Sequence, residues 1–205
     1  MRCHVFILAM ALGGQLLADD AYHVFCTNAI VAFATNVAAS PTFTNDVSRF
    51  IAETNGFERE SAQVVMAVAM YDYYGKSVDV AALDMCIDLC TNAIESVDSP
   101  CGSWQKSAAS AVLATAFATK RQYGDSYSVC TNAIARYLSQ PTSNDDVALW
   151  DAICNHHLLP GLSVRSSLDF YAALSLVFMA NTSAISVYTN SLPSAAIQKI
   201  LEAME

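Results

Sequence analysis

The apolar positions along the chain recur in steps of three and four residues. Between residues 77 and 100, apolar side chains stand at Val80, Leu83, Ile87, Cys90, Ile94 and Val97. This spacing puts one apolar face along a helix and leaves the other faces polar. No segment alternates apolar and polar residues between turn signals, so the pattern predicts no strand. The chain is therefore expected to be all-α.

The same spacing and its breaks predict where the helices lie. The expected ranges are 20–39, 44–55, 58–74, 78–98, 103–123, 126–139, 144–158, 166–181, 183–191 and 194–204. Gly75, Gly124 and Asn181 are expected to close helices in the left-handed backbone conformation. Pro100 and Pro141 are expected to stop the helices that precede them.

Two stretches of the chain are repeated. The pentapeptide Cys-Thr-Asn-Ala-Ile occurs at residues 26–30, 90–94 and 130–134. In each copy, Cys and Ile are expected to face the core, Ala to allow close approach, and Thr and Asn to face outward. The segments "SAQVVMAVAMYDYYG" (61–75) and "SAVLATAFATKRQYG" (110–124) align without gaps, and a degenerate third copy covers 167–181. The repeating unit is a small-residue helix, a stop and a second helix.

One of these units resembles a known repeat family. The segment "ATKRQYGDSYSVCTNAIARYLSQP" (118–141) is similar to the second half of a tetratricopeptide repeat. The residues that carry the likeness are Gly124, Asp125, Cys130, Ile134, Tyr137 and Pro141. The resemblance implies helix pairs whose groove binds peptides or partner proteins, and it implies no catalytic residues. The expected fold is a set of helical hairpins packed as a short, irregular tetratricopeptide-like array or α-α bundle.

Four tyrosines near the helix-pair junctions are the expected partner contacts. They are Tyr71, Tyr74, Tyr123 and Tyr127. Tyrosine is enriched at protein interfaces because its ring is apolar and its hydroxyl is polar. The alternative is that these rings belong to the core and keep only the hydroxyl in water.

The first residues have the pattern of a secretory signal peptide. Arg2 precedes an apolar run over residues 5–12, and Ala18 stands before two aspartates. This order predicts cleavage after Ala18, with a single all-α domain over 19–205 and a secreted or periplasmic location. The apolar stretches 108–118 and 170–180 are about half the length of a membrane-spanning helix. No membrane span is expected after cleavage.

The charge of the chain excludes one class of partner. Loss of Arg2 leaves nine Lys and Arg against nineteen Asp and Glu, a formal charge of −10. Such a chain repels the phosphate backbone of nucleic acid. The sequence also has no Gly-rich phosphate loop, no Gly-x-Ser-x-Gly and no His-Glu-x-x-His, so no cofactor is expected.

Two groups of residues offer chemistry as an alternative to binding. Cys101 precedes Ser103, where a helix N-terminus would stabilise a thiolate. Asp151, Cys154 and His157 recur at steps of three, on one helix face, and resemble part of a zinc shell. A small exported enzyme or metal protein would use one of these groups. An envelope protein with no ligand is the third possibility.

The cysteines give the first testable prediction. Six remain after cleavage, and an even number in an exported protein also suits disulfides. Cys26, Cys90 and Cys130 hold equivalent core positions, where cysteine acts as a small apolar side chain, so buried free thiols are expected there. Alkylation of the unfolded, unreduced protein should modify at least these three. Fewer than two modified cysteines would contradict the prediction.

Overall fold

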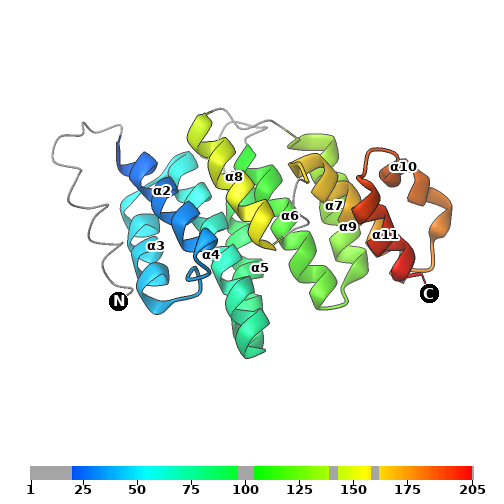
Figure 1. Ribbon diagram of the computed structural model, residues 1–205, viewed down its shortest axis with the longest axis horizontal. Coiled ribbons are helices and arrows are strands. Elements are labelled where there is room, and N and C mark those ends of the chain that lie inside the picture. Colours follow the sequence, from blue (N-terminus) through cyan, green and yellow to red (C-terminus); the bar gives the residue numbers. More distant parts are fainter. Residues whose placement is uncertain (1–19, 97–103, 139–142, 158–161, 205) are drawn as a thin grey trace.

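The described residues of the protein form helices and no strand, which confirms the all-α prediction (Figure 1). The structure is a computed structural model that describes residues 20–96, 104–138, 143–157 and 162–204, with only the backbone of 20 and of 154–157. The predicted leader, Cys101, Pro100 and Pro141 lie outside these residues. None of the described helices is both long and apolar enough to cross a lipid bilayer.

The helices follow one another closely along the chain. They are α2 (Asp20–Ala34), α3 (Pro41–Glu53), α4 (Gly56–Ser77), α5 (Val80–Glu95), α6 (Trp104–Thr119), α7 (Tyr123–Arg136), α8 (Asn144–His157), α9 (Val164–Phe178), the 3₁₀ turn η1 (Thr182–Ala184), α10 (Ile185–Thr189) and α11 (Ser194–Glu202).

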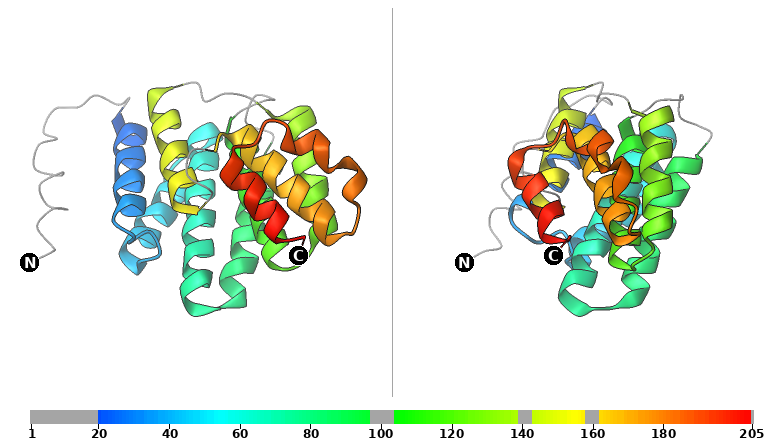
Figure 2. Two further views of the ribbon diagram at one scale, coloured as in Figure 1. Left: turned by 45° about the vertical axis from the view of Figure 1, so that its right-hand side comes forward. Right: turned by 90° about the vertical axis from the view of Figure 1, so that its right-hand side faces the viewer.

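Most of these helices form consecutive antiparallel pairs. Helix α4 packs against α5, α6 against α7, and α9 against α10. The second helix of a pair also packs against the first helix of the next pair, as α5 does on α6 and α7 on α9. The first helices α4, α6 and α9 contact one another in turn. Figures 1 and 2 show the resulting row of helix pairs, with α2 and α3 at one end and α10 and α11 at the other.

Helix α8 departs from this order. It follows α7 in the chain but lies back toward the beginning of the row, where it packs mainly against α2 and also against α4 (Figure 1). Its buried side chains Leu149, Trp150 and Ile153 belong to the main core. Helix α3 packs against α4, while α2 makes its closest contacts with α8. A helix from the second half of the chain therefore packs against the first helix that the structure describes.

Small side chains occupy the buried faces of the second helices of these pairs. In the two pentapeptide copies that lie in α5 and α7, Cys90, Ala93, Cys130 and Ala133 have no exposed surface. The isoleucines of both copies are only half-buried. The inward orientation of the cysteines is confirmed, but alanine rather than isoleucine is the second fully buried residue. With few side-chain atoms between them, the backbones of paired helices can pack at the short end of the usual range.

The pentapeptide cysteines are buried free thiols, as expected. Cys26, Cys90 and Cys130 are at most 1% exposed, and Cys86 is a fourth buried free cysteine. Burial raises the pKa of the Cys26 thiol from 9.0 to about 12. Burial also raises the pKa of Cys90, and the adjacent thiol of Cys86 adds to that shift. The thiols of Cys26 and Cys90 therefore stay protonated at neutral pH, and a protonated thiol is a poor nucleophile.

The three aligned segments of the longer repeat share the same structure at their first residue. Ser61, Ser110 and Ser167 open the three aligned segments, and all three are buried. Each hydroxyl donates to the backbone carbonyl oxygen four residues earlier, at 2.8, 2.7 and 2.9 Å. The segments diverge at their ends because α4 has 22 residues and α6 has 16.

The predicted left-handed caps are wrong. Gly75 lies inside α4 and Gly124 is the second residue of α7, and neither has a positive φ. The left-handed residues that follow described helices are instead Asn36, Val78, Arg121 and Ala180, after α2, α4, α6 and α9. Asn181, the third predicted cap, is the residue directly after the left-handed Ala180.

Backbone hydrogen bonds explain why these helices end at residues other than glycine. After α2, α6 and α9, the residue that follows the left-handed position donates its N–H to the carbonyl oxygen five residues earlier, at 2.9, 2.8 and 2.9 Å. This arrangement satisfies carbonyls that the end of a helix leaves open. The bonds offset the steric cost of a left-handed side chain, which is about 1–2 kcal/mol.

The close packing of small residues leads to a stability prediction. Ala133→Leu adds three carbon atoms to a fully buried position of α7, whereas Ala135→Leu adds them to an exposed position of the same helix. Overpacking should lower the free energy of unfolding of the first variant by about 1–3 kcal/mol. The second should stay within about 0.5 kcal/mol of the parent. Urea unfolding measures both, and equal effects would contradict close packing at this position.

Candidate interaction site

Two of the four predicted contact tyrosines use their hydroxyls inside the protein. The Tyr71 hydroxyl, on α4, lies 2.8 Å from Oγ1 of Thr119 on α6, and burial raises the pKa of Tyr71. The Tyr127 hydroxyl, on α7, lies 3.1 Å from the hydroxyl of Tyr188 on α10. Both hydrogen bonds therefore join neighbouring helix pairs.

The other two tyrosines also contact their own chain. The Tyr123 ring stacks on Phe178 of α9, with the ring centroids 4.4 Å apart. Tyr74 is half-buried and packs against the main core. The four rings thus support packing along the row of helices, and a role for them in partner binding stays a prediction.

The structure describes only part of the alternative chemical sites. Asp151 is exposed on α8, but the side chains of Cys154 and His157 and all of Cys101 lie outside the described residues. Among the residues that are described, no group of three His, Cys, Asp or Glu side chains could hold a metal ion.

Asp151 does line a large open hollow between α2, α4 and α8. Its volume is about 800 Å³, and Asp72 of α4 lines it as well. The Asp72 carboxylate is paired with Nζ of Lys76 at 2.7 Å. The other described lining residues are Asn36 and aliphatic or aromatic side chains. The described part of the lining thus holds two carboxylates, Asp72 and Asp151, among mainly apolar side chains.

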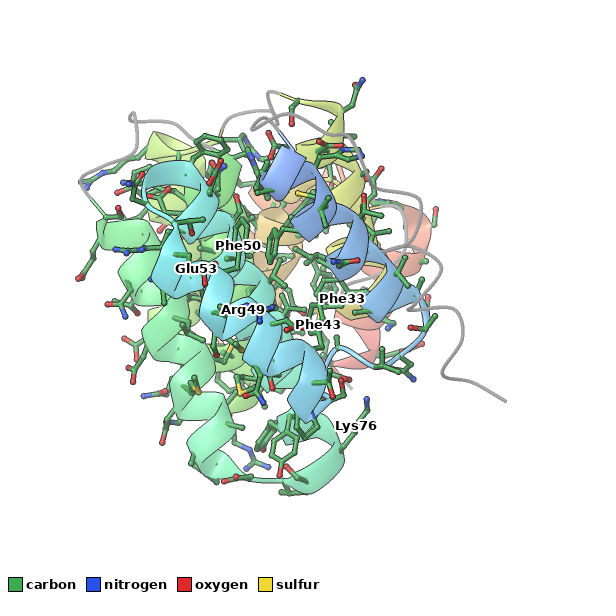
Figure 3. The ribbon with its side chains drawn as sticks, turned by 90° about the vertical axis from the view of Figure 1, so that its left-hand side faces the viewer. Phe33, Phe43, Arg49, Phe50, Glu53 and Lys76 are labelled. Carbon is green, nitrogen blue, oxygen red and sulfur yellow. The ribbon has the colours of Figure 1, made fainter. Side chains whose placement is uncertain are left out.

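A second hollow is an apolar groove between α2 and α3. Aromatic rings hold these two helices apart, unlike the small residues of the later pairs. The rings of Phe25 and Phe50 stack with their centroids 4.3 Å apart, and those of Phe33 and Phe43 meet edge to face at 6.4 Å. Figure 3 looks at this end of the row and shows Phe33, Phe43 and Phe50 between the two helices.

The groove has an apolar floor and a charged rim. Its volume is about 300 Å³, and we call it the α2–α3 groove. Val24, Phe25 and Asn28 of α2 line it together with Phe43, Asp46, Val47, Arg49, Phe50 and Glu53 of α3. Val24 is 46% exposed, so part of the floor faces solvent. Ligand sites in proteins commonly combine apolar walls with a few polar groups in this way.

Hydrogen bonds from α8 hold the α2 wall of this groove. The Tyr22 hydroxyl lies 2.7 Å from Oδ1 of Asp146 on α8 and 2.9 Å from Oγ of Ser61 on α4. Nδ1 of His23 lies 2.9 Å from Oδ1 of Asp145. The contact between His23 and Asp145 is solvent-exposed and contributes little to stability. The contacts of the Tyr22 hydroxyl are partly buried and join three helices.

The sequence contains the groove residues but gives no sign of the groove. Phe43 and Phe50 stand seven positions apart, which places them on one face of α3. That spacing is typical of any helix that faces a core. The opening is seen only in the structure, where α2 packs on α8, α3 packs on α4, and the rings stand between α2 and α3.

Comparisons with known proteins add no family to this description. No protein-family model matches the chain, and no curated protein or solved structure matches it. The helix pairs are compatible with a helical-repeat array. Function must therefore be inferred from the geometry of the chain itself.

The Tyr22 contacts give a prediction about the α2 wall. Tyr22→Phe removes the hydroxyl that links α2 to Asp146 and Ser61 and should lower the free energy of unfolding by about 1–3 kcal/mol. Tyr73→Phe is the control, because Tyr73 is 41% exposed on α4. Chemical unfolding of both variants measures the difference. A Tyr22→Phe variant as stable as its control would show that these hydrogen bonds do not hold α2.

Proposed function

We propose that the protein is an exported binding or scaffold module of the helical-repeat class, loosely tetratricopeptide-like, that acts through protein–protein contact. Its location is the exterior of the cell or the periplasm, after removal of residues 1–18. The single observation that carries the proposal is the open α2–α3 groove at one end of the row of helix pairs.

The row of helix pairs supports a binding role in general terms. Arrays of this kind expose extended surfaces that bind other proteins, and stacking of neighbouring pairs supplies their stability. In this chain, the small buried residues of α4 to α7 contribute to that stack, while Phe25, Phe43 and Val47 belong to the core and also line the groove. Its size and mixed lining suit one or a few side chains of a partner.

The groove is a better contact surface than the four tyrosines. The Tyr71 and Tyr127 hydroxyls are already bonded within the chain, and the Tyr123 ring is already stacked. Val24 and Glu53 face solvent, while Asp46 and Arg49 form an exposed pair on α3. We therefore place the main partner contact on α2 and α3.

The test is capture of a partner followed by mapping of its contact. The immobilised protein, as its source exports it, would be mixed with culture fluid and envelope extract of that source. Any stable complex would then be compared with the free protein by hydrogen exchange. The proposal predicts a saturable partner. It is contradicted if no protein binds above the level of an unfolded sample of the same chain.

A further inference from the structure

We propose that the α2–α3 groove binds a single amphipathic, positively charged helix of a partner protein, in the place that a preceding helix pair would occupy. This inference rests on the proposed function and adds the class of partner.

The order of packing along the row indicates the shape of the partner. The first helix of each later pair is covered by the second helix of the pair before it: α3 covers α4, α5 covers α6, and α7 covers α9. Among the described residues, α2 has no such preceding helix. In this fold, the first helix of a pair is thus usually covered by a helix of the pair before it. A groove between two helices is also a common receptor for an amphipathic helix.

The lining of the groove indicates an apolar face on that helix. Phe25 and Phe43 are 7% and 5% exposed and form the deep part of the floor, while Val24 stays accessible at its edge. The stacked and edge-to-face rings fix the distance between α2 and α3, so the opening is preformed. A preformed site lowers the entropy that binding must overcome.

The rim of the groove indicates the charge of that helix. Arg49 is paired with Asp46 at 2.9 Å on the surface of α3, which leaves Glu53 as the carboxylate that a partner can meet. The chain without its predicted leader has a formal charge of −10. An acidic protein attracts a cationic partner during encounter, and a Lys or Arg of the partner beside Glu53 adds a local ion pair.

Two other surfaces are weaker candidates for this partner. The turn between α4 and α5 exposes Val78 and Val80, at 71% and 56%, but it protrudes from the row (Figure 1), and neither residue lines the groove or the hollow beside Asp151. The larger hollow beside Asp72 and Asp151 has two carboxylates but fewer aromatic residues. Of these three surfaces of the described residues, the groove has the most aromatic lining, and Glu53 stands at its rim.

The test uses two synthetic helical peptides of 18 residues that share one leucine face. One carries lysine on its polar face and the other carries glutamate. Binding of each to the full chain would be measured by fluorescence anisotropy. The lysine peptide should bind at least tenfold more tightly than the glutamate peptide, and added salt should weaken it.

Two variants and their matched controls locate the site. Val24→Lys puts a charge on the floor and should weaken binding of the lysine peptide about tenfold. Its control is Val31→Lys, at another exposed position of α2 outside the groove. Glu53→Lys should weaken binding about fivefold, and its control is Glu95→Lys, which changes the net charge equally on α5. Both controls should stay within about twofold of the parent.

Several results would overturn the inference. They are equal binding of the two peptides, absence of binding, and equal effects of a variant and its control. Self-association of the chain that Val24→Lys abolishes would assign the groove to a second copy. If the cleaved chain binds the peptide and the uncleaved chain does not, the groove would be assigned to residues 1–19 as its occupant. A natural partner whose contact lies away from α2 and α3 would overturn this inference and leave the proposed function standing.

Discussion

Contact between small side chains is the interaction on which the rest of the structure depends. Cys90 and Ala93 of α5, and Cys130 and Ala133 of α7, carry no exposed surface and bring few atoms between neighbouring backbones. The threefold repetition of Cys-Thr-Asn-Ala-Ile is explained by this packing rather than by chemistry at sulfur. Thr91 adds to it by bonding its own helix, because its hydroxyl donates to the carbonyl oxygen of Ile87 at 2.9 Å. The polar residues of the motif thus stay off the packed face.

At the beginning of the row, large rings replace the small side chains between helices. The candidate site lies where this change occurs. Phenylalanine rings stand between α2 and α3, so the two helices separate and leave an apolar groove. The first pentapeptide copy lies in α2, where Cys26 and Ala29 are buried as in the other copies. The packed face of α2, however, meets α8 and not the next helix of the chain. The same motif therefore serves two packing arrangements in one protein.

Local sequence predicted more of this fold than of its site. The predicted helix 144–158 matches α8 (Asn144–His157) closely because acidic residues and the apolar spacing mark that helix locally. Helix α3 begins at Pro41 after the cap Ser40, earlier than the predicted 44, although both signals are present in the sequence. The helix ends were missed where left-handed residues are not glycine, as at Val78 and Arg121. The groove was missed because α2 packs on α8 and α3 on α4, and no local pattern encodes the contact of α2 with the distant α8.

Native-state hydrogen exchange tests this division of the molecule most directly. If small-residue packing in α4 to α7 forms the stable part of the row, amides of α6 and α7 exchange only through global unfolding, and amides of α2 and α3 exchange through partial opening of lower free energy. The measurement is a denaturant series read helix by helix. Protection of α2 and α3 equal to that of α6 and α7 would contradict the account.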